Sequence, residues 1–281
     1  MNIRHVEMFR CCGVVLLLST LAACQSVKTT DAGAVGVNRK QHMAMVSEQQ
    51  VEQGAAQAYA QQMAQARAAG ALNVNTAETV RVRRIAARLI DQTDSFRKDA
   101  KNWGWQINVL STRDMNAYCM PGGRIMVYTG LMERLSLTDA ELATVLAHEI
   151  AHALREHSRE QMSHQMAQQA GLGVLGAIVG LGDAPMQLAS ALSDVTFTLP
   201  KSREQESEAD QIGLELMSRA GYDPHAAVDL WKKMIKAGQG GTPGFFSTHP
   251  SSSDRISNIE KLIPRVLPLY KAANPVAANP T

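Results

Sequence analysis

The sequence of 281 residues has few aromatic side chains and no dominant charge. Phe, Trp and Tyr make up 5% of it, which disfavours a β-sandwich or barrel, whereas its many Ala, Gln and Met residues favour a mainly helical domain. Lys and Arg number 28 and Asp and Glu 26, and this balance argues against a nucleic-acid surface or a polybasic membrane segment. The composition predicts a globular protein and excludes nucleic acid as a partner.

Long hydrophobic runs are missing as well. The apolar stretch 11–23 is about 13 residues long, whereas a bilayer span needs roughly 20, so the pattern is that of a signal peptide over residues 1–23. It ends in Leu21-Ala22-Ala23-Cys24, which resembles the bacterial lipobox. We therefore expect lipidation of Cys24, a lipidated tether over 24–46, and an outer membrane lipoprotein that faces the periplasm of a bacterial cell envelope. The alternative is an ordinary signal peptide in which Cys24 occurs by chance.

Cysteine is too scarce to build a disulfide framework. Cleavage before Cys24 removes Cys11 and Cys12 and leaves Cys119 as the one unmodified thiol. A single thiol has no internal partner, so folding depends on core packing. Cys119 is interpreted as a small buried hydrophobic residue and not as a nucleophile.

Patterns of apolar and capping residues predict an α+β, mainly helical fold. A capping box at Thr138 and Glu141 opens one helix, which is predicted to run through His157. Three short strands with a Pro-Gly-Gly turn predict a small sheet packed on that helix. The other predicted helices cover 47–70, 76–96, 203–220, 224–237 and 253–262, and the predicted strands cover 105–110, 117–120 and 124–129.

The Gly-rich apolar segment 170–181 allows two interpretations. It is too short for a transmembrane helix and too apolar to stay exposed. It is either a core helix with close contacts at its glycines, or a mobile lid or membrane-dipping flap over the active-site cleft.

The motif His148-Glu149-Ile150-Ala151-His152 predicts a zinc site. Two histidines four residues apart lie on one face of a helix and can ligate the same tetrahedral zinc ion. Glu149 points about 100° away and can act on a water molecule as general base. The motif therefore favours a hydrolase with one zinc ion per chain.

A hydrolytic zinc site needs a third protein ligand, and an acidic helix offers it. Glu206 and Asp210 share a helix face, so that one can bind zinc while the other supports a ligating histidine. Glu204 and Glu208 are competing candidates. His157 is interpreted as a surface or capping histidine, since it lies about 140° round the helix from His152.

Several motifs in order carry a resemblance to a known family. They are His148-Glu-x-x-His152, Ser202-Arg203-x-x-Glu206-x-x-Ala209-Asp210-x-x-Gly213, Gly221-Tyr222-Asp223-Pro224, and Thr248-His249-Pro250 with Arg255-Ile256. Across about residues 76–262 they resemble the HtpX and CAAX-prenyl-protease family of gluzincin metalloproteases, and more narrowly its periplasmic lipoprotein branch. The resemblance implies a zincin-like fold, Glu206 as the third zinc ligand, Asp210 as a supporting residue and endopeptidase activity on proteins.

The same resemblance suggests two further parts of the site. Asn116 and Ala117, continuing to Gly122 and Gly123, are similar to the family's edge-strand region, where main-chain hydrogen bonds can hold an extended peptide. His249 is expected to be a site residue that either stabilises the oxyanion or occupies the open zinc position in a latent state.

We therefore expect a zinc endopeptidase domain over residues 47–264 and a flexible tail over 265–281. The resemblance implies that its substrates are unfolded, misfolded or misassembled cell-envelope proteins, and the oligomeric state stays open. Two alternatives are a chaperone-like binding lipoprotein with a structural or closed zinc site, and an assembly scaffold. An intact Glu149 argues against both, because a structural zinc site needs no general base.

Overall fold

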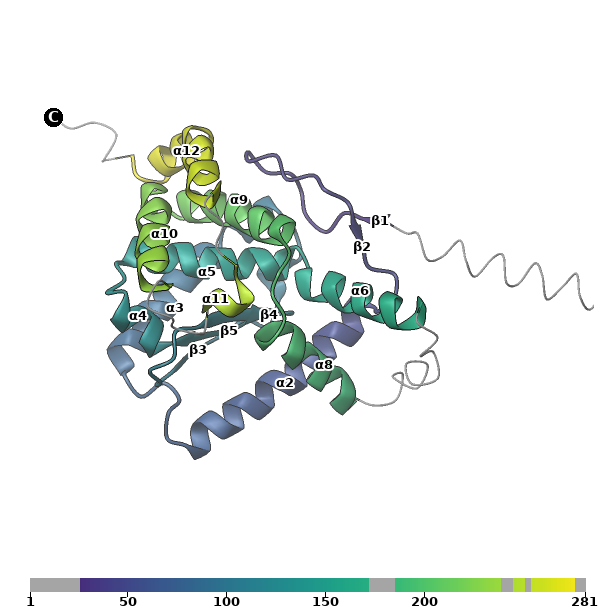
Figure 1. Cartoon of the computed structure of the whole chain (residues 1–281). Helices are drawn as coiled ribbons and strands as arrows, with labels where there is room; N and C mark the ends of the chain where they lie inside the picture. Colours follow the sequence, from purple (N-terminus) through teal and green to yellow (C-terminus); the bar gives the residue numbers. More distant parts are fainter. Residues whose placement is uncertain (1–25, 172–184, 239–244, 251–253, 276–281) are drawn as a thin grey trace, which may run out of the picture.

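The computed structural model describes residues 26–171, 185–238, 245–250 and 254–275. Helix α5 (Asp139–Leu154) lies in the middle of the body, with a three-stranded sheet on one side and helices α9 (Arg203–Arg219), α10 (His225–Gly238) and α12 (Asp254–Ala273) on the other (Figure 1). The remaining helices are α2 (Glu48–Ala68), α3 (Thr76–Ile90), α4 (Thr129–Arg134), α6 (His157–Gly171), α8 (Pro185–Phe197) and α11 (Phe245–Thr248). The predicted α+β, mainly helical class is confirmed.

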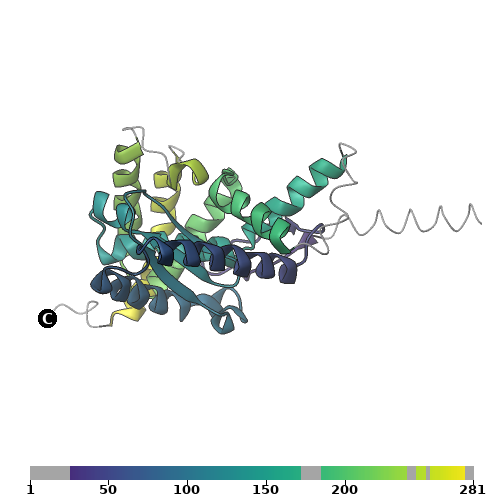
Figure 2. The same ribbon diagram turned by 90° about the horizontal axis from the view of Figure 1, so that it is seen from below.

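The sheet has the strand order β3-β5-β4 and is buried on both faces. Strand β5 (Arg124–Tyr128) pairs in parallel with β3 (Gln106–Leu110) and antiparallel with β4 (Ala117–Met120). Alternate side chains of β4 enter different cores: Ala117 and Cys119 pack with α3 and α5, and Tyr118 and Met120 with α2 and α8. Figure 2 shows α2 crossing the sheet on the side opposite α5. Burial on both sides explains why these strands lack an alternating polar pattern.

Helix α5 begins where the capping box predicts. Thr138 accepts a hydrogen bond from the backbone N–H of Glu141, and the Glu141 carboxylate accepts one from the backbone N–H of Thr138 at 2.8 Å. Every residue from Glu141 to Leu154 is buried, so this helix is enclosed on all sides and is not amphipathic. The motif from His148 to His152 therefore sits on an enclosed helix.

A glycine sets the distance between α5 and α9. A Cβ atom added at Gly213 would lie 3.0 Å from the backbone nitrogen of His148, closer than ordinary van der Waals contact. The backbones of the two helices therefore meet at the residue that begins the motif. This contact brings the acidic start of α9 over the histidines of α5.

Both ends of the described chain differ from the expectations of a flexible tether and tail. Val35, Val37, Met43 and Val46 are buried, and two short strands, β1 (Ser26–Val27) and β2 (Gln41–His42), pair within this segment. At the other end, α12 continues to Ala273 although it contains Pro264 and Pro268, since Ile259, Ile263 and Val266 form a buried stripe. In both segments, apolar side chains spaced among polar ones provide enough burial to hold the chain.

The structure also bears on the cysteine and on membrane insertion. Cys119 is buried, as predicted, and burial raises the pKa of its thiol well above the ordinary value. Within the described part of the chain, no helix combines the length and hydropathy that crossing a membrane requires.

Candidate metal centre

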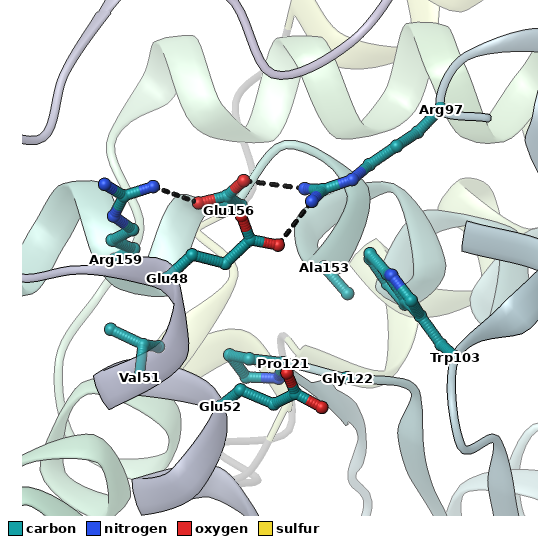
Figure 3. A pocket seen from close by; sticks show the side chains of 10 residues that line it. All are labelled: Glu48, Val51, Glu52, Arg97, Trp103, Pro121, Gly122, Ala153, Glu156 and Arg159. Atoms are coloured by element: carbon teal, nitrogen blue, oxygen red, sulfur yellow. Dashed lines mark hydrogen bonds and ion pairs between the residues drawn. The ribbon is translucent and has the colours of Figure 1, made fainter. Parts of the chain in front are cut away.

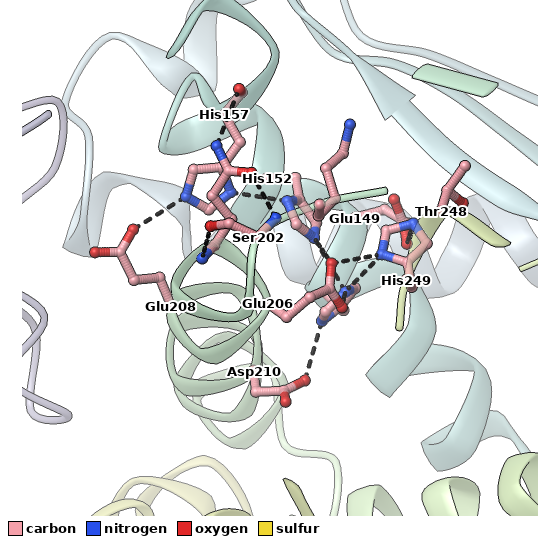
Figure 4. Close-up of polar contacts among 12 residues, drawn as sticks. Glu149, His152, His157, Ser202, Glu206, Glu208, Asp210, Thr248 and His249 are labelled. Atoms are coloured by element: carbon pink, nitrogen blue, oxygen red, sulfur yellow. Dashed lines mark hydrogen bonds and ion pairs between the residues drawn. The ribbon is translucent and has the colours of Figure 1, made fainter. Parts of the chain in front are cut away.

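Four side chains from three separate elements converge at the centre of the domain. His148 and His152 lie on successive turns of α5, Glu206 comes from α9, and His249 follows α11 (Figure 4). The Nε2 atoms of His148 and His152 are 3.1 Å apart, and the Glu206 carboxylate lies 3.4 and 3.3 Å from them. His249 Nδ1 is 3.3 Å from His148 Nε2 and 2.9 Å from Glu206 Oε1. All four ligand atoms lie within 4.8 Å of one another.

These distances fit a tetrahedral zinc site. Zinc bonds of about 2.0–2.1 Å to nitrogen and oxygen place tetrahedral ligand atoms roughly 3.3 Å apart. Burial alone would lower the pKa of His148, yet Glu206 and Asp210 raise it to about 9. Burial lowers the pKa of His152 well below its ordinary value, although Glu206 opposes this shift. In their spacing and in the chemistry of their donor atoms, the four side chains suit a zinc ion.

Asp210 and Arg255 contact the side chains of His148 and Glu206 from outside the ligand cluster. Asp210 Oδ1 lies 3.1 Å from His148 Nδ1, so that the carboxylate can accept the N–H of this imidazole. Arg255 donates to both oxygens of Asp210 and forms an ion pair with Glu206 Oε2 at 2.8 Å. Its guanidinium stacks 3.5 Å over the Trp231 ring. Arg255 entered the sequence argument only as part of a motif, because nothing in the sequence shows which acids it contacts.

Glu149 lies beside the ligand cluster and is not one of its four members. Its carboxyl group is buried, and burial raises its pKa. Oxygen Oε1 lies 3.5 Å from His249 Nε2 and accepts no hydrogen bond from the described residues. An unsatisfied, buried carboxyl group next to the ligands is available to exchange a proton with a water molecule.

The acidic residues of α9 have different surroundings in the structure. Glu206 faces the two motif histidines, whereas Glu208 faces Arg155 and His157, and Glu204 is exposed. Of the candidates for the third ligand, only Glu206 reaches the cluster.

His157 is not the surface residue that the sequence analysis expected. It is fully buried, and its Nδ1 atom lies 2.7 Å from Nδ1 of His152. The expectation assumed a helix that continues through His157, but α5 ends at Leu154 and α6 begins at His157. Glu156, between them, has a φ of +52°, which folds the chain back toward His152. A non-glycine residue in this left-handed conformation gives no clear signal in a sequence.

The predicted edge-strand residues lie in two different settings. Asn116 and Ala117 are at the start of β4, which is the edge strand next to α5. Gly122 and Gly123 have φ angles of +75° and +84° and form the turn from β4 to β5. This turn lies beside Trp105 and Arg124. Asn116 and Ala117 therefore lie at an edge of the sheet, whereas the glycines shape the hairpin.

A groove of about 680 Å³ reaches the centre between α9 and α12. Glu206 and Asp210 form part of one wall, and Arg255 and Pro250 part of the opposite side. Of the four cluster residues, Glu206 alone lines this groove, and the side chains of all four are almost fully buried.

Some predictions fall outside the described residues. These are the signal peptide over 1–23, lipidation of Cys24, and all of the segment 170–181 beyond Gly171. They stay predictions from the sequence.

Comparison with known proteins identifies the family. The model of peptidase family M48 matches residues 76–263, more than half of the chain, and this range contains every residue of the centre. The chain belongs to peptidase family M48. This membership confirms the predicted zincin-like fold, the zinc cofactor and, for the family, the class of metalloendopeptidase.

Relatives of this M48 chain are named as metalloproteases of mitochondria and of bacteria. Mitochondrial metalloendopeptidase OMA1 of Schizosaccharomyces pombe is 40% identical over 192 residues, which cover 66% of this chain and 53% of the relative. Human metalloendopeptidase OMA1 is 34% identical over 197 residues, 63% of this chain and 36% of the relative. Metalloprotease YcaL of Escherichia coli is 28% identical over 201 residues, 68% of this chain and 78% of the relative. The chain thus spans about half, or less, of these two mitochondrial relatives.

These relatives correct the predicted location. An outer membrane lipoprotein of a bacterial envelope was expected, but the relatives at 40% and 34% identity are mitochondrial, above the 28% of the bacterial protein. The prediction rested mainly on the N-terminal apolar run and its lipobox-like end at Cys24, and the mitochondrial location named for these relatives contradicts it. Without that location, nothing restricts the predicted substrates to envelope proteins.

Proposed function

We propose that this chain is a zinc metalloendopeptidase that hydrolyses peptide bonds in misfolded or misassembled proteins. The observation that carries the proposal is the position of Glu149, which lies beside three suitable zinc ligands and is not itself one of them. A purely structural site needs no unsatisfied carboxyl group at its side.

The residues have separate roles in this reaction. His148, His152 and Glu206 would hold zinc, which supplies a Lewis acid for the scissile carbonyl and makes water more acidic. Glu149 takes a proton from the attacking water and returns it to the leaving amine. Asp210 fixes the orientation of His148, and Arg255 balances the negative charge of Asp210 and Glu206.

The edge strand supports extended, unfolded segments as substrates. Asn116 O accepts a hydrogen bond from Tyr128 N at 3.0 Å, so the antiparallel alternation leaves the backbone groups of Ala117 and Cys119 facing away from β5. A peptide that pairs with these groups must itself be extended. Main-chain pairing selects backbone conformation more than side chains, which suits many different misfolded proteins.

The segment around α11 supports a closed, latent state. His249 Nδ1 takes the fourth position of the ligand cluster, where a hydrolytic site needs water. Phe245 stacks on the His249 ring at 4.4 Å and donates its backbone N–H to Met115 O, next to the edge strand. We propose that this segment must move before a substrate can bind, and that His249 blocks the metal until it does.

Digestion of an unfolded protein tests the proposed function. The purified chain should cleave casein, lose this activity with a chelator and regain it when zinc is added back. Folded globular proteins should resist cleavage under the same conditions. Cleavage that persists in chelator, or zinc-loaded protein that never cleaves unfolded chains, would contradict the proposal.

A further inference from the structure

Besides Asp210, helix α9 contributes Glu208, which belongs to a buried series of polar contacts that ends at His152. The Nδ1 atom of His152 lies 2.7 Å from Nδ1 of His157, and Nε2 of His157 lies 3.0 Å from Glu208 Oε2 (Figure 4). Both histidines and Glu208 are buried. His152 is thus linked to the Glu208 carboxylate through the imidazole of His157.

The proton positions along this chain follow from the ligand role of His152. A histidine that binds a metal through Nε2 is neutral and carries its proton on Nδ1, so His152 must donate and His157 Nδ1 must accept. His157 then carries its own proton on Nε2 and donates it to Glu208. Every donor therefore meets an acceptor, and only one tautomer of each ring satisfies the chain.

We propose that His157 and Glu208 are positioning residues that fix the tautomer and ring orientation of His152 for zinc. The inference rests on the proposed zinc site. His148 obtains the same support directly from Asp210, at 3.1 Å, so the two motif histidines use different devices. The Glu208 carboxylate contacts His157 and Arg155, so its link to His152 runs through the His157 ring.

The turn between α5 and α6 places His157 in this position. Glu156, with its φ of +52°, receives ion pairs from Arg97 at 2.6 Å and Arg159 at 2.8 Å. Figure 3 shows these contacts beside a cavity, where Glu48 also meets Arg97. A non-glycine residue in this left-handed conformation is strained and persists only when its surroundings hold it, as these two guanidinium groups do.

Two arginine side chains hold the Glu208 carboxylate in place. Arg155, whose side chain is fully buried, donates to both Glu208 oxygens, at 2.9 and 3.0 Å. Arg39, from the segment before α2, donates to Glu208 at 2.8 Å and also pairs with Glu160. The carboxylate is therefore fixed before zinc binds, which suits a positioning role.

Zinc affinity tests the proposal independently of catalysis. We expect His157→Ala to bind zinc about 10- to 100-fold more weakly in competition with a chelator, the usual loss when support of a metal-bound histidine is removed. His157→Asn should recover part of this loss, because its side-chain oxygen can accept from His152 at the Nδ1 position. His164→Ala is the matched control, since His164 is exposed on the same helix. It should bind zinc as the unmodified chain does.

The outcomes separate this inference from the proposed function. If the unmodified chain fails to bind zinc, the proposed zinc site itself is wrong. If it binds zinc and a folded His157→Ala variant binds equally well, or if the Asn and Ala variants are equally weak, the positioning role is wrong. The variants should lower kcat with little change in KM, because the ring that they disturb holds the metal and not the substrate.

Discussion

The Nδ1 atom of His249 lies 3.3 Å from Nε2 of His148, a spacing within the 3.1–3.4 Å that separate the other three ligand atoms of the cluster. His249 Nδ1 therefore lies among the atoms that would ligate a metal ion. The sequence left two roles open for this residue, and this position supports the blocking role that we propose. A group that stabilises an oxyanion must point at the substrate carbonyl, whereas this ring points at the metal position.

Replacing His249 should activate the enzyme. We expect His249→Ala to retain zinc and to raise kcat/KM for casein, because the fourth metal position becomes available to water. The measurement is cleavage of a labelled casein at saturating zinc. If His249 instead stabilised the oxyanion, activity would fall by about 10²–10³-fold, and this result would overturn the blocking role.

Replacing Glu149 should separate catalysis from metal binding. We expect Glu149→Gln to bind zinc normally and to lose proteolysis by roughly 10²–10⁴-fold, since the amide cannot take up the proton. Zinc content and casein cleavage are measured on the same preparation. Glu206→Gln is the matched control and should lose zinc as well as activity, because it removes a ligand. Undiminished cleavage by Glu149→Gln would rule out the mechanism.

A methyl group at Gly213 should disturb the metal centre through the backbone. The added Cβ would press on the backbone of His148 at 3.0 Å and push α9, with Glu206, away from α5. Replacing glycine by alanine stabilises a helix by about 1 kcal/mol, whereas overpacking between the helices lowers the free energy of unfolding by about 1–3 kcal/mol. We therefore expect Gly213→Ala to reduce zinc affinity more clearly than thermal stability. Unchanged affinity in chelator competition would show that the helix spacing is not critical.

Removing Arg39 should weaken the fold in a pH-dependent way. Burial by itself would raise the pKa of Glu160, but hydrogen bonds from Arg39 and Gln205 bring it down to about 2. Because this pKa is below the ordinary 4.5, the ionised carboxylate stabilises the fold above pH 4.5, and the contribution is lost as pH falls toward 2. We expect Arg39→Ala to lower the free energy of unfolding at pH 7.

The measurement for Arg39 is denaturant unfolding at several pH values. The difference between Arg39→Ala and the unmodified chain should shrink as pH falls from 4.5 toward 2. Arg84, which pairs with Asp139 and is mostly exposed, is the control, and its replacement should cost about 1 kcal/mol or less. A difference that is the same at pH 7 and pH 3 would contradict the role assigned to the Arg39 ion pairs.

The residues of the zinc site could be predicted wherever local geometry decides their position. His148 and His152 share a face because four residues make about one helical turn, and the same spacing joins Glu206 to Asp210. The capping box at Thr138 fixed the start of α5 in the same local way. The three strands and their turn also followed from short-range patterns.

Only the tertiary structure decided which distant groups meet. The sequence shows neither that His249 lies against His148 nor that Arg255 bridges Glu206 and Asp210, because these contacts join elements far apart in the chain. His157 was misjudged for the same reason, since its direction depends on one left-handed residue held by Arg97 and Arg159. Local spacing determined which side chains can share a helix face, whereas packing between helices determined which of them share a metal site.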